Sequence, residues 1–283
     1  MSSEGPAVGV PDVDGSRPPA EAIVSAVESS GCRALVDAPE HLAEADVGVI
    51  VAPGDAVLER LASAEPDAPV LPIALDPGIQ SVGADDLDAA LEAVCRNVTD
   101  GTLALARHPL VDVQVDGTTV GRALRDVTVL TAEPARISEF AVECDATGQV
   151  DEIRADGVVV ATPAGSHGYA AAADGPVLAP GTGIAVVPIA PFRTERTRWI
   201  VPPDGLSITV RRDETPVTVE ADGRAIREID KRSYCHQCEF FAEPPEFRCT
   251  NEGTEILELT RLDTVRVANC PVILEDERIE RTR

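Results

Sequence analysis

The spacing of apolar residues changes near residue 100, and this change constrains the fold more than any other feature of the sequence. Before it, short apolar runs alternate with segments of helical spacing, which is typical of β-α-β units in a small doubly wound sheet. After it, valine-rich segments follow one another across Gly, Asp or Pro turns, which is typical of a β-rich domain. The sequence therefore predicts an α/β lobe over residues 1–100 and a β-rich lobe over 101–229.

The same patterns place the individual elements. In the first lobe we expect strands at 7–10, 33–36, 47–52 and 70–74, and helices at 19–29, 55–64 and 84–97. In the second lobe we expect strands at 111–115, 123–131, 139–144, 157–162, 184–189, 206–211 and 216–220. A linker is expected near 229–233, before a tail at 233–283 that has a different composition.

The chain is strongly acidic. Its formal net charge is −25, and Lys231 is the only lysine among 24 basic residues. Such a surface repels nucleic acid and anionic membranes, and no window approaches about 18 consecutive apolar residues, so neither partner is expected. Because concentrated salt screens self-repulsion, we expect a halophilic source, although an acidic protein from an ordinary cell is the alternative. The polar start lacks a signal pattern, which favours the cytoplasm.

A segment that begins at Asp156 carries the most specific motif. It reads D-G-V-V-V-A-T-P-A-G-S-H-G-Y and ends in Gly175 and Pro176. This pattern predicts a strand that leads into a Thr-Pro-x-Gly turn and then a helix. The backbone amides and small hydroxyls of such a turn can receive polar groups of a nucleotide, and the ring of Tyr169 can stack on adenine.

This segment resembles the signature of the NAD kinase family. Segments 134–136, 139–140, 188–191 and 219–223 resemble further motifs of that family in the same order, so the resemblance covers roughly 7–225. It implies an N-terminal α/β lobe and a β-rich C-terminal lobe, with nucleotides in the crevice between them. It also implies phosphorylation of the adenosine 2′-hydroxyl of NAD to give NADP. The donor would be ATP or polyphosphate with a divalent metal such as Mg²⁺, and the assembly a dimer or tetramer.

The resemblance also implies a set of substrate-binding residues in the motif. They are Asp156, Gly157, Thr162, Pro163, Gly165, Ser166, His167 and Tyr169. His167 stands where the family has a hydroxyl residue, and its imidazole could donate a hydrogen bond or fill space.

The catalytic motif of the family is only partly present. Where the family has G-G-D-G-T, this chain has P-G-D-A-V at 53–57. The resemblance implies that Asp55 is the general base and that Gly54 helps to seat phosphates, while Asp55 could also serve as a helix N-cap. Because Pro53 lacks an N–H donor and Ala56 resists positive φ, we expect a poorer phosphate cradle. These residues leave open whether the chain has kept kinase activity.

A second departure lies at 124–127, which reads L-R-D-V where the family has L-N-[DE]-V. Asp126 is kept and can bind ribose hydroxyls. Arg125 could clash with the adenosine, pair with Asp126 or bind a phosphate. In the loop 75–81 only a glycine of the family motif survives. Dinucleotide binding is therefore better supported than phosphoryl transfer. The alternatives are a catalytically impaired NAD(P)-binding relative that acts as a sensor or partner-binding protein, and a kinase of another hydroxylated substrate.

Four of the seven cysteines fall in the tail. Cys235 and Cys238 form a C-x2-C pair, and Cys249 and Cys270 follow. Thiolates suit zinc, so a structural four-thiolate site is predicted, with buried thiols or a redox pair as the alternative. His236 is expected to be exposed rather than a ligand. The remaining cysteines, Cys32, Cys95 and Cys144, are expected in the core.

Overall fold

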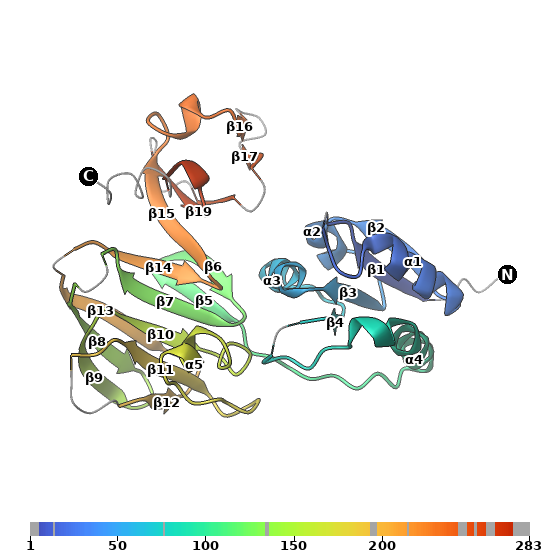
Figure 1. Ribbon diagram of the computed structural model, residues 1–283, viewed down its shortest axis with the longest axis horizontal. Coiled ribbons are helices and arrows are strands. Elements are labelled where there is room, and N and C mark those ends of the chain that lie inside the picture. The colour runs from blue at the N-terminus through green and yellow to red at the C-terminus, as the bar shows by residue number, and fades with distance from the viewer. Residues whose placement is uncertain are drawn as a thin grey trace.

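The computed structural model describes residues 6–13, 15–75, 77–133, 136–192, 197–213, 215–242, 248–251, 254–258 and 264–273. Figure 1 shows an α/β lobe at one end of the molecule and a β-rich lobe at the other, with the C-terminal segment rising from the β-rich lobe. The expected two-lobed α/β plus β-rich fold is confirmed.

The α/β lobe contains a four-stranded parallel sheet of order β2-β1-β3-β4. The strands are β1 (Ala7–Pro11), β2 (Arg33–Asp37), β3 (Val49–Pro53) and β4 (Val70–Ile73), and the helices are α1 (Ala20–Ser29), α2 (Pro39–Ala43), α3 (Asp55–Ala64), η1 (Ala84–Asp86) and α4 (Leu87–Asp100). Side chains on β3 alternate between the faces. Val49 and Val51 pack with α1 and α4, whereas Ile50 and Ala52 pack with α2 and α3. The lobe is therefore doubly wound, as predicted.

The β-rich lobe is built on an eight-stranded sheet of order β12-β11-β10-β7-β14-β15-β19-β18. Its strands are β7 (Asp126–Thr131), β10 (Gly157–Ala161), β11 (Ile184–Ile189), β12 (Trp199–Val201), β14 (Val217–Ala221), β15 (Arg224–Asp230), β18 (Glu255–Glu258) and β19 (Thr264–Ala268). One face packs on a three-stranded sheet of β8 (Ser138–Cys144), β9 (Gly148–Ala155) and β13 (Leu206–Arg212). On the other face, Ala170 of α5 (Tyr169–Ala172) packs against β10 and β11.

Smaller elements complete the fold. The hairpin of β5 (Val111–Val115) and β6 (Thr118–Ala123) joins the core of the β-rich lobe through Val113 and Val120. The tail holds η2 (Cys235–Gln237) and a short hairpin of β16 (Phe241–Ala242) and β17 (Arg248–Cys249).

Several predicted boundaries differ from the structure, and two of them differ for a visible reason. The expected strand 123–131 is divided, because β6 ends at Ala123 and β7 begins at Asp126, and the Asp222 carboxylate accepts hydrogen bonds from the amides of residues 124–126. The expected linker 229–233 begins inside a strand. Buried Ile229 belongs to β15, which pairs with β19, so the tail extends the main sheet.

Cys32 and Cys95 are buried in the core of the α/β lobe, as expected, but their pairing in a disulfide was not predicted. Cys144 is a free thiol buried in the β-rich core. Within the described residues, no helix has the length and apolar character needed to cross a membrane.

Candidate active site between the two lobes

Asp55 stands at the point where β3 passes into α3. Gly54 takes φ +84°, and the open space around its Cα shows that the turn, rather than crowding, sets this conformation. The helix begins at Asp55 with Gly54 in the cap position, so the alternative role of Asp55 as N-cap is wrong. A carboxylate in the first turn is still favoured by the helix dipole. The Asp55 side chain is 27% exposed.

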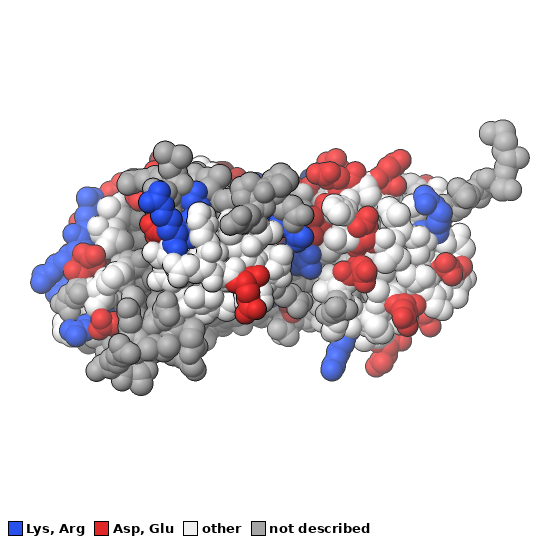
Figure 2. Space-filling model, turned by 90° about the horizontal axis from the view of Figure 1, so that it is seen from above, with Lys and Arg blue, Asp and Glu red and all other residues white. Residues whose placement is uncertain are grey.

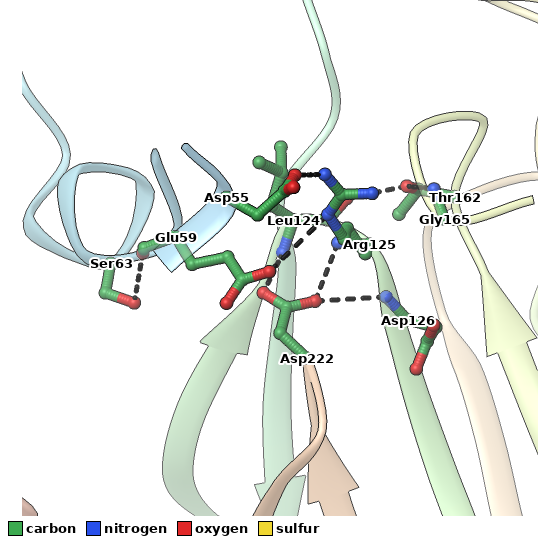
Figure 3. Close-up of polar contacts among 9 residues, drawn as sticks. All are labelled: Asp55, Glu59, Ser63, Leu124, Arg125, Asp126, Thr162, Gly165 and Asp222. Atoms are coloured by element: carbon green, nitrogen blue, oxygen red, sulfur yellow. Dashed lines mark hydrogen bonds and ion pairs between the residues drawn. The ribbon is translucent and has the colours of Figure 1, made fainter. Parts of the chain in front are cut away.

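Arg125 crosses from the β-rich lobe to α3. Its guanidinium pairs with the carboxylate of Asp55, and its Nε lies 3.4 Å from Oε1 of Glu59, one helical turn later (Figure 3). The Arg125 side chain is only 14% exposed. Of the three roles left open for Arg125, pairing is therefore seen, but with Asp55 and Glu59 rather than with Asp126.

Asp222 fixes the backbone that carries Arg125. It lies in the turn between β14 and β15, where Asp222 and Gly223 both have positive φ. Its carboxylate accepts hydrogen bonds from the amides of Leu124, Arg125 and Asp126 at 2.8, 2.7 and 3.1 Å. Hydrogen bonds to a charged acceptor are stronger than neutral ones, so this turn is firmly held.

The carboxylates around Arg125 repel one another. Burial, with the negative charges of Asp222 and Asp126, raises the pKa of Glu59 to about 7, while Arg224 opposes the rise. Burial and the charge of Asp222 likewise raise the pKa of Asp126 to about 6. Such shifts often mark functional sites because they adjust carboxyl groups for proton transfer or cation binding.

The Thr-Pro-x-Gly turn packs directly against the Arg125 segment. The Thr162 hydroxyl donates to the carbonyl of Leu124 at 2.6 Å, and the Thr162 amide donates to the carbonyl of Arg125 at 2.9 Å. A Cβ on Gly165 would lie 2.1 Å from the same Arg125 carbonyl, so only glycine fits there. The turn and the ion-paired arginine therefore share one backbone segment.

The same turn also meets the α/β lobe. A Cβ on Gly78 would lie 2.1 Å from the carbonyl of Ala164, and Ala164 and Leu124 join the core that contains Leu58 and Leu61 of α3. The glycine of loop 75–81 thus serves the contact between lobes. Asp76 of that loop, and Pro134 and Ala135 of the segment 134–136, lie outside the described residues.

The remaining predicted residues divide into buried and exposed groups. Ser166 is fully buried: its hydroxyl donates to the carbonyl of Pro163 and accepts from the amide of Leu178. Gly157 is buried in β10, where a Cβ would lie 2.5 Å from the carbonyl of Val129. These contacts are internal to the lobe and shape the turn and the sheet.

On the exposed side, His167 is exposed and Tyr169 lines a cavity of about 200 Å³ with Asp174, Ile189 and Arg198. The pKa of Tyr169 is raised by burial and by the charges of Glu220, Asp156 and Asp126.

Sequence analysis missed Glu59 and Asp222. Glu59 follows Asp55 at helical i+4 spacing, which could have put both on one face of α3. Asp222 was part of the hairpin 219–223, but nothing in that short pattern indicates which backbone its carboxylate reaches.

The four tail cysteines come together. Cys235, Cys238, Cys249 and Cys270 all line one small cavity beside Ile229 and Phe241. Burial, together with the neighbouring thiols, raises the pKa of Cys235 to about 11. His236 is exposed, as expected, and its ring stacks on Phe241 with centroids 5.7 Å apart.

The chain is similar to known proteins both in sequence and in fold. Residues 124–239 match the model of the ATP-NAD kinase C-terminal domain, and residues 227–276 match a domain of unknown function, DUF8135. NAD kinase from Methanosarcina mazei is 43% identical over 102 residues, which are 36% of this chain and 35% of the relative. NAD kinase from Zymomonas mobilis is 39% identical over 127 residues, which are 41% and 49% of the two chains.

The structure of an NAD kinase from Archaeoglobus fulgidus in complex with ATP is similar over most of the fold. Its TM-score is 0.60 at 25% identity, and the match covers 77% of this chain and 84% of that one. The comparisons therefore support the resemblance of this chain to the NAD kinase family. Yeast NADH kinase in complex with NADH shares the fold, with a TM-score of 0.61 at 17% identity over 79% of this chain and 77% of that chain. The sequence matches to Methanosarcina relatives span only about a third of the length of those NAD kinases.

Proposed function

We propose that this protein is an NAD kinase, which transfers a phosphoryl group from ATP or polyphosphate to the adenosine 2′-hydroxyl of NAD. One observation carries the proposal. The guanidinium of Arg125 binds Asp55 of the α/β lobe, while the backbone carbonyl of Arg125 binds the Thr162 amide of the nucleotide turn. The candidate base and the candidate nucleotide site therefore meet at one residue.

Asp55 acts on the hydroxyl in this proposal. Its carboxylate accepts the 2′-hydroxyl proton as that oxygen forms a bond to the transferred phosphorus, and the bond from phosphorus to the leaving phosphate breaks. Asp126, one residue beyond Arg125, orients the ribose. The proton thus ends on Asp55 and the negative charge on the departing ADP or shortened polyphosphate.

In this proposal the guanidinium of Arg125 binds the phosphate of the donor. A guanidinium that is paired with Asp55 competes with the substrate hydroxyl for that carboxylate, and it also has the geometry that binds phosphate. We propose that donor phosphate takes over the guanidinium and so frees Asp55. This exchange compensates for the donor-side motif P-G-D-A-V, in which Pro53 offers no amide.

A divalent cation fits the acidic character of the site. Burial raises the pKa values of Glu59 and Asp126 most, and the charge of Asp222 adds to the rise. A cation would relieve this repulsion, and carboxylate oxygens are ligands that Mg²⁺ prefers. Within the described residues no three His, Cys, Asp or Glu side chains form a ready metal site, so the ion is proposed to enter with the donor phosphates. It supplies charge neutralisation at the transferred phosphoryl group.

An assay of the purified protein at high salt tests the proposal. NAD with Mg-ATP or polyphosphate should yield NADP, and Asp55→Asn should lower turnover by roughly 10²–10⁴-fold while NAD binding by calorimetry is kept. NAD binding without turnover in the unaltered chain would instead identify a non-catalytic NAD-binding relative. Equal turnover in Asp55→Asn would remove the role of Asp55.

The setting of the protein is part of the proposal. A net charge of −25 supports a salt-rich cytoplasm, and Figure 2 shows acidic side chains spread over the visible face of the α/β lobe. Val177, Phe192 and Ile200 are exposed apolar side chains of the β-rich lobe, which supports a homo-oligomer that assembles through this lobe. Analytical ultracentrifugation at high salt would show a dimer or tetramer, and a monomer would exclude it.

A further inference from the structure

The tail converges on a single point although its cysteines are spread over 36 residues of sequence, from 235 to 270. Each of the four side chains lines the same cavity, whose volume is about 20 Å³. A void of that size holds about one water molecule or one small ion. Cys235 is buried, whereas Cys238, Cys249 and Cys270 are half-buried.

The backbone brings the first pair together in a tight turn. The amide of Cys238 donates to the carbonyl of Cys235 at 3.0 Å, and the amide of Phe241 donates to the carbonyl of Cys238 at 3.2 Å. The turn therefore closes the C-x2-C pair and leads into β16. Both residues of the pair reach the cavity from this one turn.

Separate elements supply the other two thiols. In the β16–β17 hairpin Cys249 is paired with Phe241, three residues after Cys238. Cys270 follows β19 and comes directly after Asn269, which has a positive φ of 53°. The side-chain oxygen of Asn269 accepts a hydrogen bond from the amide of Ala225 at 3.0 Å, which holds this end of β19 to β15. The 235–238 turn, the β16–β17 hairpin and the turn after β19 thus bring the four cysteines to one cavity.

The apolar cluster around the four cysteines is small. Its buried members are Ile229, Cys235, Val265, Val267 and Ile273. Segments with so little core are commonly held by a metal or by disulfides. The stacking of His236 on Phe241 accounts for the one histidine in the tail without giving it a ligand role.

We infer that Cys235, Cys238, Cys249 and Cys270 form a structural zinc site with four thiolate ligands. Zinc in structural sites is tetrahedral and favours this ligand set, and a closed set leaves no position for substrate. The described residues show no group already gathered at ligand distances, so binding draws the sulfurs inward about the cavity. The ion would fasten the β16–β17 hairpin and the segment after β19 to the end of β15.

This site is independent of the proposed kinase activity. The four cysteines line a cavity in the tail, and none belongs to the Thr-Pro-x-Gly turn or to the Asp55–Arg125 pair. Zinc content and NADP formation can therefore fail separately.

Metal analysis of the full chain, purified without chelator and without a metal-affinity column, tests the inference. We expect one zinc per chain, released as the four thiols are modified with a mercurial reagent and detected with a zinc dye. Cobalt substitution should give the intense visible bands of a tetrahedral thiolate site together with charge-transfer absorption in the near ultraviolet. A chain that carries no zinc, and gives no such spectrum with cobalt, would overturn the site.

Variants separate ligands from bystanders. Cys249→Ser or Cys270→Ser should lower zinc affinity at least tenfold in competition with a chelator, whereas Cys144→Ser, a buried thiol of the other core, should keep full zinc content. If a ligand variant does not fold, the unaltered chain still decides the matter by its metal content. Mass analysis that finds a disulfide among the four cysteines of the freshly purified chain would also overturn the inference.

Discussion

The two sides of the contact between the lobes are built in different ways. On the β-rich side, Thr162 and Gly165 are buried and held by backbone contacts to the Leu124–Arg125 segment. On the α/β side, Asp55 and Glu59 project from one helix and are held by ion pairs to Arg125. Backbone hydrogen bonds inside a packed core keep one geometry, whereas a guanidinium can exchange one anion for another. We infer that the nucleotide side is preformed and that the donor side is set by the anion bound to Arg125.

Removal of the Asp222 carboxylate should break the preformed side most severely. Asp222→Ala leaves the amides of residues 124–126 without their acceptor. Each such loss costs about 1–3 kcal/mol, so we expect a decrease of roughly 3–5 kcal/mol in the free energy of unfolding. Urea denaturation measures it.

Asp116→Ala is the matched control for that variant. Asp116 occupies the equivalent place in the β5–β6 hairpin, also with positive φ and followed by glycine, but its side chain is exposed. Both variants lose the preference of aspartate for this conformation, so their difference isolates the hydrogen bonds. Equal losses would show that the Asp222 bonds add nothing.

A pair of glycine substitutions compares the two sides directly. Gly165→Ala pushes a methyl group against the Arg125 carbonyl, so we expect a loss of about 2–3 kcal/mol in stability and at least tenfold weaker NAD binding. Gly54→Ala meets nothing within 4 Å and loses only through its φ of +84°, about 1 kcal/mol. Calorimetry with NAD and thermal unfolding measure both. A larger loss in Gly54→Ala would reverse the assignment of the rigid side.

Sequence reasoning predicted the architecture well because strand and helix periodicity is local. The helix 55–64 and the strands 111–115 and 184–189 agree with α3, β5 and β11 at both ends. The Thr-Pro-x-Gly turn after β10 also has the expected place between a strand and a helix, because its residues meet constraints within one short segment. Its nucleotide-binding role stays a prediction.

What sequence could not predict depends on pairing across long distances. Asp222 lies 97 residues from Arg125, and the partners of Arg125 lie in the other lobe. A pattern of neighbouring residues does not say which backbone a carboxylate will reach. For the same reason the disulfide between Cys32 and Cys95, 63 residues apart, was not foreseen.

Substitution of Arg125 sharpens the comparison at the donor side. If donor phosphate binds the guanidinium, Arg125→Asn should raise the donor KM by about 10–100-fold, because a charge-assisted hydrogen bond to the phosphate is lost. The affinity for NAD should change little. Steady-state kinetics with varied donor, and calorimetry with NAD, separate the two quantities.

Arg122→Ala is the control for Arg125→Asn. Arg122 also joins the lobes, through Glu65 at the end of α3, but it lies outside the site. An equal rise of donor KM in both variants would mean that Arg125 only fastens the lobes. A loss of NAD affinity alone in Arg125→Asn would place this arginine on the nucleotide side instead.

The smallest expected effect is the pH dependence of Glu59. Its carboxyl titrates near pH 7 in the folded protein and near its ordinary value of 4.5 when unfolded. Between these values the folded state binds more protons than the unfolded state, so the free energy of unfolding falls as pH rises through that range. We expect Glu59→Gln to remove about 1–3 kcal/mol of this decline, as measured by urea denaturation at several pH values.

The control for Glu59 removes one carboxylate from elsewhere on the same lobe. Glu21→Gln on α1 takes away an exposed charge and should leave the slope of stability against pH close to that of the unaltered chain. A flatter slope in both variants would point to the general repulsion of an acidic surface. A steeper slope in Glu59→Gln would mean that the ion pair with Arg125 lowers the pKa of Glu59 more than burial raises it. Arg125 would then be held firmly by both Glu59 and Asp55, and its guanidinium would exchange less readily to a donor phosphate.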